Sequence, residues 1–326
     1  MKNLIRLFLW AIIAVALPYT FGGCAGGGGG GDNDDGDDGM NYSGLTDAAV
    51  INKLNAEEIS GGAFGAGLVG DGMMALSLDQ DQNNNTVKKF RSVKIPVILS
   101  DSLNLLNFGS SSTGGFEAAL ETVSETLNGN CGGSMSYSVQ ADNLKGTFSG
   151  NFTFKDYCND GTTINGKARF DGKMNVDTGE FIEAYFSFDN LSGADLKLDG
   201  DMDIDFSASP NVITFNAYGQ DPSSGKVFWI KDYSIAIDEY TGYIQIEMAG
   251  RFYHPDYGYV TLSTTELFVL HDGDEWPTSG TLIVEGANSA KAKISAIDNA
   301  NCAIEADIDG DDSYEWVSET LIWDEI

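Results

Sequence analysis

The stretch ADLKLDGDMDIDF, Ala194 to Phe206, decides the fold class because apolar and charged side chains alternate along it. Leucine, methionine, isoleucine or phenylalanine stands at every even position from 196 to 206 except Gly200, and the odd positions carry aspartate or lysine. Successive side chains of a β-strand point to opposite faces of the sheet. A period of two therefore predicts a strand with one buried face and one wet face.

The same period continues on both sides of this stretch, from Gly133 to the C-terminus. Turn sequences separate the alternating runs, among them NDGT, VDTGE, DPSSGK, YTGY and PDYGY. About a dozen strands joined by short turns are typical of an antiparallel meander. We therefore expect a mainly β protein built on a large, curved antiparallel sheet, either a half-barrel or barrel-like.

Glycines interrupt the apolar face at positions where a strand normally places a large side chain. They are Gly166, Gly172, Gly200 and Gly250. An interior strand glycine marks a bend or the close approach of another backbone. We expect each of them to let the sheet coil tightly, or to let a helix or a ligand approach the strand.

Segments upstream of the strands have apolar residues at helical spacing. They are residues 116–127, FEAALETVSETL, with Phe116, Leu120, Val123 and Leu127, and residues 47–58, with Val50, Ile51 and Leu54. Such a stripe normally packs against a core. We expect N-terminal helices on the concave face of the sheet, and a ligand-accommodating cavity beside them is the alternative.

The first residues of the chain have the features of an export signal. Lys2 and Arg6 precede a short apolar run from Leu7 to Phe21. That run is shorter than the ~20 residues that cross a bilayer as a helix, which disfavours a permanent membrane span.

The residues that follow, FGGC from Phe21 to Cys24, resemble the lipobox of bacterial lipoproteins, although this family prefers leucine where Phe21 stands. The resemblance implies cleavage before Cys24 and acylation of the new N-terminus, so that lipid holds the protein at a membrane. Ala25 stands where an aspartate would resemble an inner-membrane retention signal, so the resemblance favours the outer membrane. An ordinary cleaved signal is the alternative.

Glycine and aspartate dominate the residues after Cys24, which predicts a flexible, solvated tether. Residues 25–40 would span roughly 20–24 Å between their ends. We expect four regions: a signal peptide at 1–23, the lipidated cysteine and tether at 24–42, a helix-containing part at 43–130 and the β-rich body at 131–326.

The chain carries 49 acidic and 18 basic residues, a formal net charge of −31. Nucleic-acid binding depends on clustered Lys and Arg that contact phosphates, and this sequence has no basic patch. We therefore expect no nucleic-acid partner. The expected partners are the membrane, through the lipid anchor, and an unidentified envelope protein or apolar ligand.

Three cysteines remain after Cys24, and an exported chain meets an oxidising compartment. We expect a disulfide between Cys131 and Cys158, because two predicted strands between them return the chain to its starting point. Cys302 lies on the apolar side of the alternating stretch NCAIEA, which predicts a buried thiol.

The stretch DIDGDDSYE, residues 307–315, offers carboxylates at alternate positions and resembles the first half of an EF-hand calcium loop. The implied calcium ligands are Asp307, Asp309, Asp311 and Glu315. The sequence departs from that family at Asp312, where the loop needs glycine, and at Ser318, where it needs a bidentate glutamate. A solvated hairpin turn is the alternative.

Catalytic motifs built on serine, zinc-binding histidines, paired cysteines or a phosphate loop do not occur in the sequence. Two histidines are present. His254 precedes Pro255 in an expected turn, and His271 with Asp272 is the least unlikely catalytic pair.

From Cys131 onward the chain resembles β-rich proteobacterial lipoproteins of unknown function. The resemblance rests on a CGG start, on DYC near the expected disulfide, and on the segments GRFYHPDYGYVTLSTTE, PTSGTLIVEGANSAKAKI and EADIDGDDSYEW. It implies no activity. We expect a non-enzymatic cell-envelope lipoprotein that binds a partner protein or an apolar ligand with its concave face. A transmembrane β-barrel, with its apolar residues facing lipid, is the first alternative, and an envelope hydrolase is the second.

Overall fold

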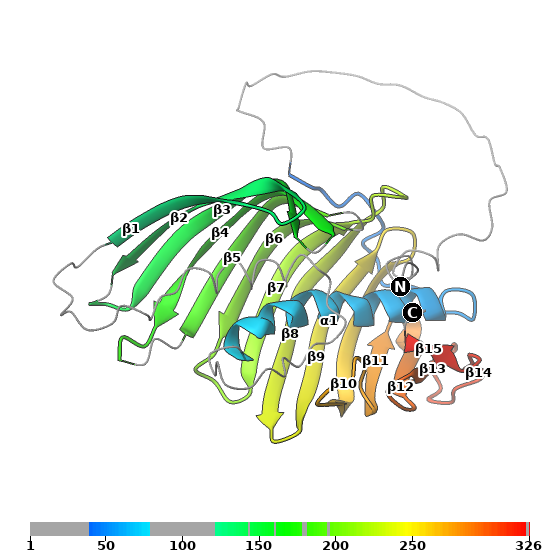
Figure 1. Cartoon of the computed structure of the whole chain (residues 1–326). Coiled ribbons are helices and arrows are strands. Elements are labelled where there is room, and N and C mark those ends of the chain that lie inside the picture. The colour runs from blue at the N-terminus through cyan, green and yellow to red at the C-terminus, as the bar shows by residue number, and fades with distance from the viewer. Residues whose placement is uncertain are drawn as a thin grey trace, which may run out of the picture.

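The structure is a computed structural model that describes residues 39–78, 121–142, 144–159, 161–177, 181–193, 196–323 and 326. Within these residues the chain forms a 15-stranded antiparallel sheet and one long helix (Figure 1). The expected signal peptide, Cys24 and most of the tether lie outside the described residues, as do Phe116 and Leu120 of the expected second helix.

The strands follow one another across the sheet in chain order from β1 to β14, and β15 pairs with β13. The first seven are β1 (Glu121–Asn128), β2 (Gly132–Asp142), β3 (Thr147–Asn159), β4 (Thr162–Met174), β5 (Phe181–Ser192), β6 (Lys197–Asp205) and β7 (Asn211–Gln220). The others are β8 (Val227–Tyr240), β9 (Tyr243–His254), β10 (Gly258–His271), β11 (Ser279–Glu285), β12 (Lys291–Ala296), β13 (Asn301–Asp307), β14 (Trp316–Val317) and β15 (Leu321–Ile322). A single 3₁₀ turn, η2 (Ala287–Ser289), links β11 to β12.

The sheet is open, because no pairing among the described strands joins β1 to β14. Figure 1 shows it twisting from one edge to the other, as the right-handed twist of each strand requires. The predicted mainly β antiparallel meander is confirmed, but the sheet is open and uncurled, not the expected half-barrel or barrel-like form.

Strand β6 separates the two faces of the sheet as its alternation predicts. Leu198, Met202 and Ile204 are buried, whereas Asp203 and Asp205 are exposed. The buried residues lie opposite residues of the same face in β5 and β7. We call the face with the buried apolar side chains the inner face, and the opposite one the outer face.

Helix α1 (Ala56–Leu78) lies across the inner face and contacts strands β7 to β13 (Figure 1). Ile59 and Phe64 are among its buried side chains, and the Phe64 ring lies 5.3 Å from that of Phe268 and 5.0 Å from that of Trp323. A helix from the N-terminal region on this face is therefore confirmed. In the part of the chain that the structure describes, no helix combines the length with the apolar character that a membrane crossing requires.

The helix expected at residues 47–58 is wrong in its bounds, because α1 begins only at Ala56. The expected inward residues Val50 and Leu54 are 61% and 86% exposed. The chain turns at Asn52, whose side-chain oxygen accepts the N–H of Leu54 at 2.9 Å. Asparagine competes with helical hydrogen bonding in this way, so the helix starts after it.

The helix expected at residues 116–127 is wrong for every residue of it that the structure describes, since these residues form β1. Val123 and Leu127 lie opposite Val139 and Met135 of β2. Residues four apart share a face in a helix and also in a strand, so the apolar spacing fits both. Hydrogen bonding to β2 decides between them.

The strand glycines are sites of close backbone approach. Gly166, Gly200 and Gly250 have φ angles of +112°, +143° and +142°, which L-residues with side chains rarely adopt. A Cβ atom at Gly250 would lie 2.6 Å from the Cα of Tyr233 in β8, and one at Gly172 would also meet the backbone of the next strand. Register shifts mark β-bulges beside Gly166, Gly200 and Gly250. The expected close approach is confirmed, but the approaching chain is the neighbouring strand.

Candidate functional site

The carboxylates expected to hold calcium come together in the turn after β13, where their ligand oxygens all lie within 4.8 Å of one another. They belong to Asp307, Asp309, Asp311 and Glu315. Asp307 is buried, and its carboxylate accepts the backbone N–H groups of Gly310 at 2.7 Å and of Asp312 at 2.9 Å. Such bonds are those of a turn closed by an aspartate, and calcium binding stays a prediction.

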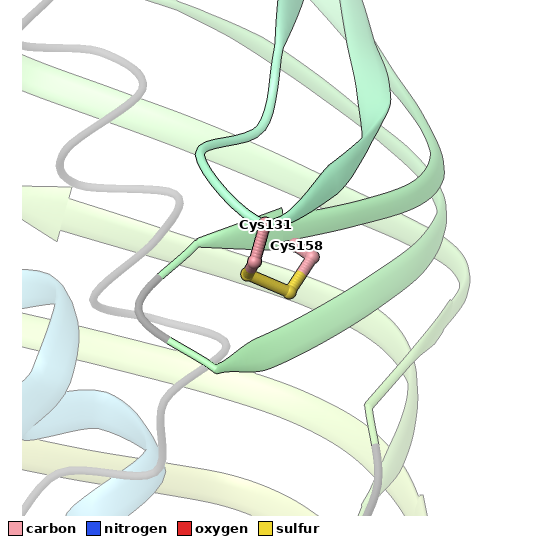
Figure 2. Close-up of a disulfide and its surroundings, with 2 residues drawn as sticks. All are labelled: Cys131 and Cys158. Carbon is pink, nitrogen blue, oxygen red and sulfur yellow. A yellow bond between two sulfur atoms is a disulfide. The ribbon is translucent and has the colours of Figure 1, made fainter.

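The predicted disulfide between Cys131 and Cys158 is confirmed (Figure 2). It joins the turn between β1 and β2 to the end of β3, where the Cys131 N–H also donates to the Cys158 carbonyl oxygen at 3.2 Å. Cys302 is buried, as predicted, and burial raises the pKa of its thiol to about 12. A thiol that stays protonated at neutral pH is a poor nucleophile.

His271 and Asp272 lie exposed at the end of β10. The imidazole of His271 lies beside the ring of Tyr243, 5.9 Å between centroids. Burial and close charged partners usually adjust the pKa values of catalytic groups. The exposed position of these two residues therefore does not support a catalytic role for the pair.

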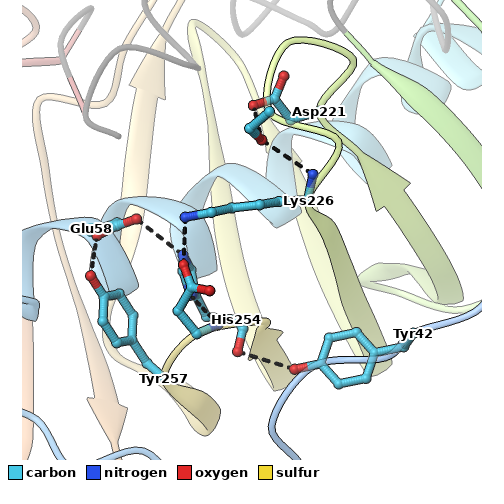
Figure 3. Close-up of polar contacts among 8 residues, drawn as sticks. Tyr42, Glu58, Asp221, Lys226, His254 and Tyr257 are labelled. Carbon is cyan, nitrogen blue, oxygen red and sulfur yellow. Dashed lines mark hydrogen bonds and ion pairs between the residues drawn. The ribbon is translucent and has the colours of Figure 1, made fainter. Parts of the chain in front are cut away.

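A polar cluster that sequence patterns did not predict joins α1 to the turn between β9 and β10 (Figure 3). His254, the last residue of β9, is 1% exposed, and its Nε2 lies 3.1 Å from Oε1 of Glu58 in α1. Tyr257 donates its hydroxyl hydrogen to the other oxygen of Glu58 at 2.7 Å. We call Glu58, His254 and Tyr257 the Glu–His–Tyr cluster.

The surroundings of His254 determine which nitrogen carries its proton. Its Nδ1 accepts the backbone N–H of Asp256 at 3.2 Å. Nδ1 is thus an acceptor, so it is Nε2 that carries a hydrogen and donates it to Glu58. Tyr257 stacks on the imidazole at 4.4 Å between centroids, and Phe228 meets it edge-on at 5.2 Å.

The cluster stabilises a carboxylate that burial alone would destabilise. Burial opposes the charge on Glu58, but the hydrogen bonds from His254 and Tyr257 outweigh it, so the pKa of the Glu58 carboxyl lies below its ordinary value. Burial, together with the hydrogen bond to Glu58, raises the pKa of the Tyr257 phenol. Lys226 adds positive charge nearby, with its Nζ 2.5 Å from a carboxylate oxygen of Asp256.

The N-terminal segment also meets this cluster. The hydroxyl oxygen of Tyr42 lies 3.0 Å from the carbonyl oxygen of His254 (Figure 3). Burial raises the pKa of the Tyr42 phenol to about 12, so it stays a neutral donor. Three segments therefore meet here: the residues around Tyr42, the first turn of α1 and the turn between β9 and β10. Through its hydrogen bonds the cluster holds the first turn of α1 against the sheet. Glu58 and His254 are 196 residues apart, and no local spacing could have predicted their contact.

Replacing Glu58 with Gln should lower the free energy of unfolding at neutral pH by about 1–2 kcal/mol, because an amide replaces only part of a carboxylate's hydrogen bonding. A carboxyl whose pKa is depressed by folding adds stability above its unfolded pKa of about 4.3, and this stability is lost as pH falls through the folded pKa. Urea unfolding of a soluble Cys24→Ser form should therefore show the two proteins converging as pH falls below the folded pKa of Glu58.

Glu57→Gln is the matched control, because Glu57 is an exposed neighbour of Glu58 on the same turn of α1. It should leave the free energy of unfolding and its pH dependence unchanged. Identical pH dependence of the free energy of unfolding in Glu58→Gln and Glu57→Gln would show that the Glu–His–Tyr cluster does not stabilise the fold.

Comparison of the chain with protein-family models, with curated proteins and with solved structures finds no match. Its function is therefore inferred from its own residues and their geometry.

Proposed function

We propose that the protein is a non-enzymatic lipoprotein of the bacterial cell envelope, anchored in the outer membrane by acyl chains on Cys24, whose β-sheet domain binds a partner. The observation that carries this proposal is the position of Cys24 in the sequence, two glycines after a short apolar run and just before a segment rich in glycine and aspartate. Each buried methylene of an acyl chain contributes ~0.8 kcal/mol, so two or more chains hold a protein stably at a membrane.

Two features of the folded body support an anchored, exported protein. Met40, just after the Gly/Asp segment, packs on the folded body: it is buried, and its N–H donates to the Asp199 carboxylate at 2.9 Å. The disulfide between Cys131 and Cys158 belongs to an oxidising compartment such as the envelope. A body that starts beside a tether and carries a disulfide is what this proposal requires.

The geometry favours a partner protein over an apolar ligand. Helix α1 occupies the inner face of β7 to β13, so that part of the inner face is closed to an apolar ligand. A shallow groove of about 300 Å³ on β2 to β5 is lined mainly by polar and charged side chains, including Gln140, Asp171, Lys173 and Glu183. Apolar ligands prefer predominantly apolar concavities.

The experiment has two parts: the mass of the membrane-extracted parent is measured by intact-mass analysis, and Cys24 is replaced with Ser. The parent should be cleaved before Cys24 and carry acyl chains. The Cys24→Ser chain, exported with an ordinary signal, should be soluble in the periplasm. Phe21→Leu is the matched control, because it changes the same short motif toward the lipobox and should leave the protein acylated.

An unmodified mature parent would refute the lipid anchor. A Cys24→Ser chain that still needs detergent would instead favour the transmembrane barrel. Turnover in a broad hydrolase screen of the soluble form would favour the envelope hydrolase.

A further inference from the structure

The outer face of β7 to β10 carries a row of aromatic side chains, one from each strand. The row consists of Tyr218, Trp229, Tyr253 and Tyr259, which lie opposite one another in the register. Successive ring centroids lie 5.9 Å, 4.4 Å and 5.3 Å apart. Tyr253 is buried, whereas the other three residues are partly exposed. We call these residues the aromatic row.

Two cations stand over this row. Lys231 of β8 lies opposite Arg251 of β9, and such like-charged pairs are unfavourable in a sheet. The Lys231 ammonium lies 4.8 Å from the ring centroid of Trp229, and the Arg251 guanidinium lies 5.5 Å from that of Tyr259. Neither cation has a carboxylate partner in the part of the chain that the structure describes. A small positive area therefore lies over aromatic rings in a chain whose net charge is −31.

The segment Met40–Leu45, which we call the strap, lies on the same face. It starts at β6, where the Met40 N–H donates to Asp199, and its Tyr42 ring lies 6.0 Å from Trp229 and 5.9 Å from Tyr253. Met40 follows Gly39, the first residue that the structure describes, so the described chain starts on the face that carries the aromatic row. The expected tether, residues 24–42, therefore joins the folded body on this face.

We propose, resting on the lipid anchor proposed above, that the outer face of β7 to β10 is the surface that touches the membrane, with phosphate head groups bound by Lys231 and Arg251. Tyr and Trp favour the membrane interface because one end of each ring system is apolar and the other is polar. Lys and Arg extend their charged ends to the same depth. Phosphate is the anion that such cations meet in every phospholipid.

The charge of the rest of the outer face limits this contact to β7 to β10. On the neighbouring strand β6, burial and adjacent carboxylates raise the pKa values of Asp201 and Asp203, which reflects how densely acidic groups are packed there. That area is repelled by anionic lipid. A weak contact is enough, because a short tether holds the surface at an effective concentration of about a millimolar.

The test imposes the anchor chemically, so that it does not depend on acylation in the cell. The mature chain, starting at Cys24, is coupled through the Cys24 thiol to a maleimide lipid in vesicles of phosphatidylcholine and phosphatidylethanolamine. Cys302 is buried and does not compete. Tryptophan fluorescence is then quenched by a spin label on the lipid head group.

Trp229→Phe should lose most of the quenching that the parent shows. Trp316→Phe is the matched control, because Trp316 is partly exposed on β14, far across the sheet from β8. It should keep that quenching. Equal quenching in the Trp229→Phe variant and the parent, or none in the parent, would overturn the membrane-facing assignment.

The cations are tested in the same vesicles. Lys231→Gln with Arg251→Gln should reduce the quenching of Trp229, because the head groups lose their ligands. The matched control is Lys291→Gln with Lys293→Gln, which also removes two positive charges, but from β12, where Asp312 and Glu305 pair with them. It should leave the quenching of Trp229 unchanged. Equal losses in both double variants would show a general charge effect and would overturn the assigned phosphate contact. Because coupling replaces acylation, this result stands apart from the mass analysis of the natural anchor.

Discussion

Replacing Gly250 with Val should lower the free energy of unfolding by about 2–6 kcal/mol, the sum of ~1–3 for overpacking and ~1–3 for a strained backbone. Gly250 has a φ of +142°, and a Cβ there would lie 2.6 Å from the Cα of Tyr233. Neither the backbone of β8 nor that of β9 can move without breaking the bulge between them. Thermal and urea unfolding of the soluble Cys24→Ser form measure the effect.

Gly242→Val is the matched control, because Gly242 also has a positive φ, +92°, but a Cβ there meets nothing within 4 Å. It stands in the turn between β8 and β9. It should show the cost of backbone strain alone, so the difference between the two variants isolates the clash. Valine has a higher strand propensity than glycine, so without the clash and the strain the substitution would raise the stability of the protein. A Gly250→Val protein that melts at or above the parent would mean that these strands are not packed as the structure has them.

Removing the disulfide with Cys131→Ser and Cys158→Ser should lower the free energy of unfolding by about 3–4 kcal/mol, because the reduced unfolded chain regains the entropy of an open loop. The two cysteines are 27 residues apart. The bond also holds the β1–β2 turn against the end of β3 at one margin of the sheet. Urea unfolding of the Cys24→Ser form under oxidising conditions measures the loss.

Reduction of the parent provides the internal control for this prediction. A reducing agent should lower the stability of the parent by the same amount and leave the double variant unchanged, since Cys302 is buried and unpaired. A double variant as stable as the oxidised parent would show that the denatured chain keeps this hairpin together without the bond.

The strands could be predicted from the sequence because their signal is local. In β6 the alternation of Leu198, Met202 and Ile204 with aspartates specifies both the strand and the face it buries. Gly200 and Gly250 signalled close backbone approach for an equally local reason, since only glycine leaves room for another chain. The pairing of Cys131 with Cys158 followed from two strands lying between them.

The bounds of the helix could not be predicted, because the local signals in the N-terminal region are ambiguous or contrary to propensity. Residues 121–127 fit both a strand and a helix, and only pairing with β2 makes them β1. The sequence of α1 is rich in glycine, a poor helix former. Gly62 and Gly67 lie so close to Phe252 and Met248 that a Cβ would come within 2.8 Å and 2.6 Å of them. Packing against the sheet outweighs propensity here.

By itself the sequence determined the strand order, the buried face and the disulfide, because each depends on neighbours in the chain or on one residue's own chemistry. Only the tertiary structure decided where α1 lies, which residues meet in the Glu–His–Tyr cluster, and that the strap lies beside the aromatic row. These contacts join residues as distant as Glu58 and His254. A long-range contact forms only after the sheet has fixed the positions of both partners, so no local pattern encodes it.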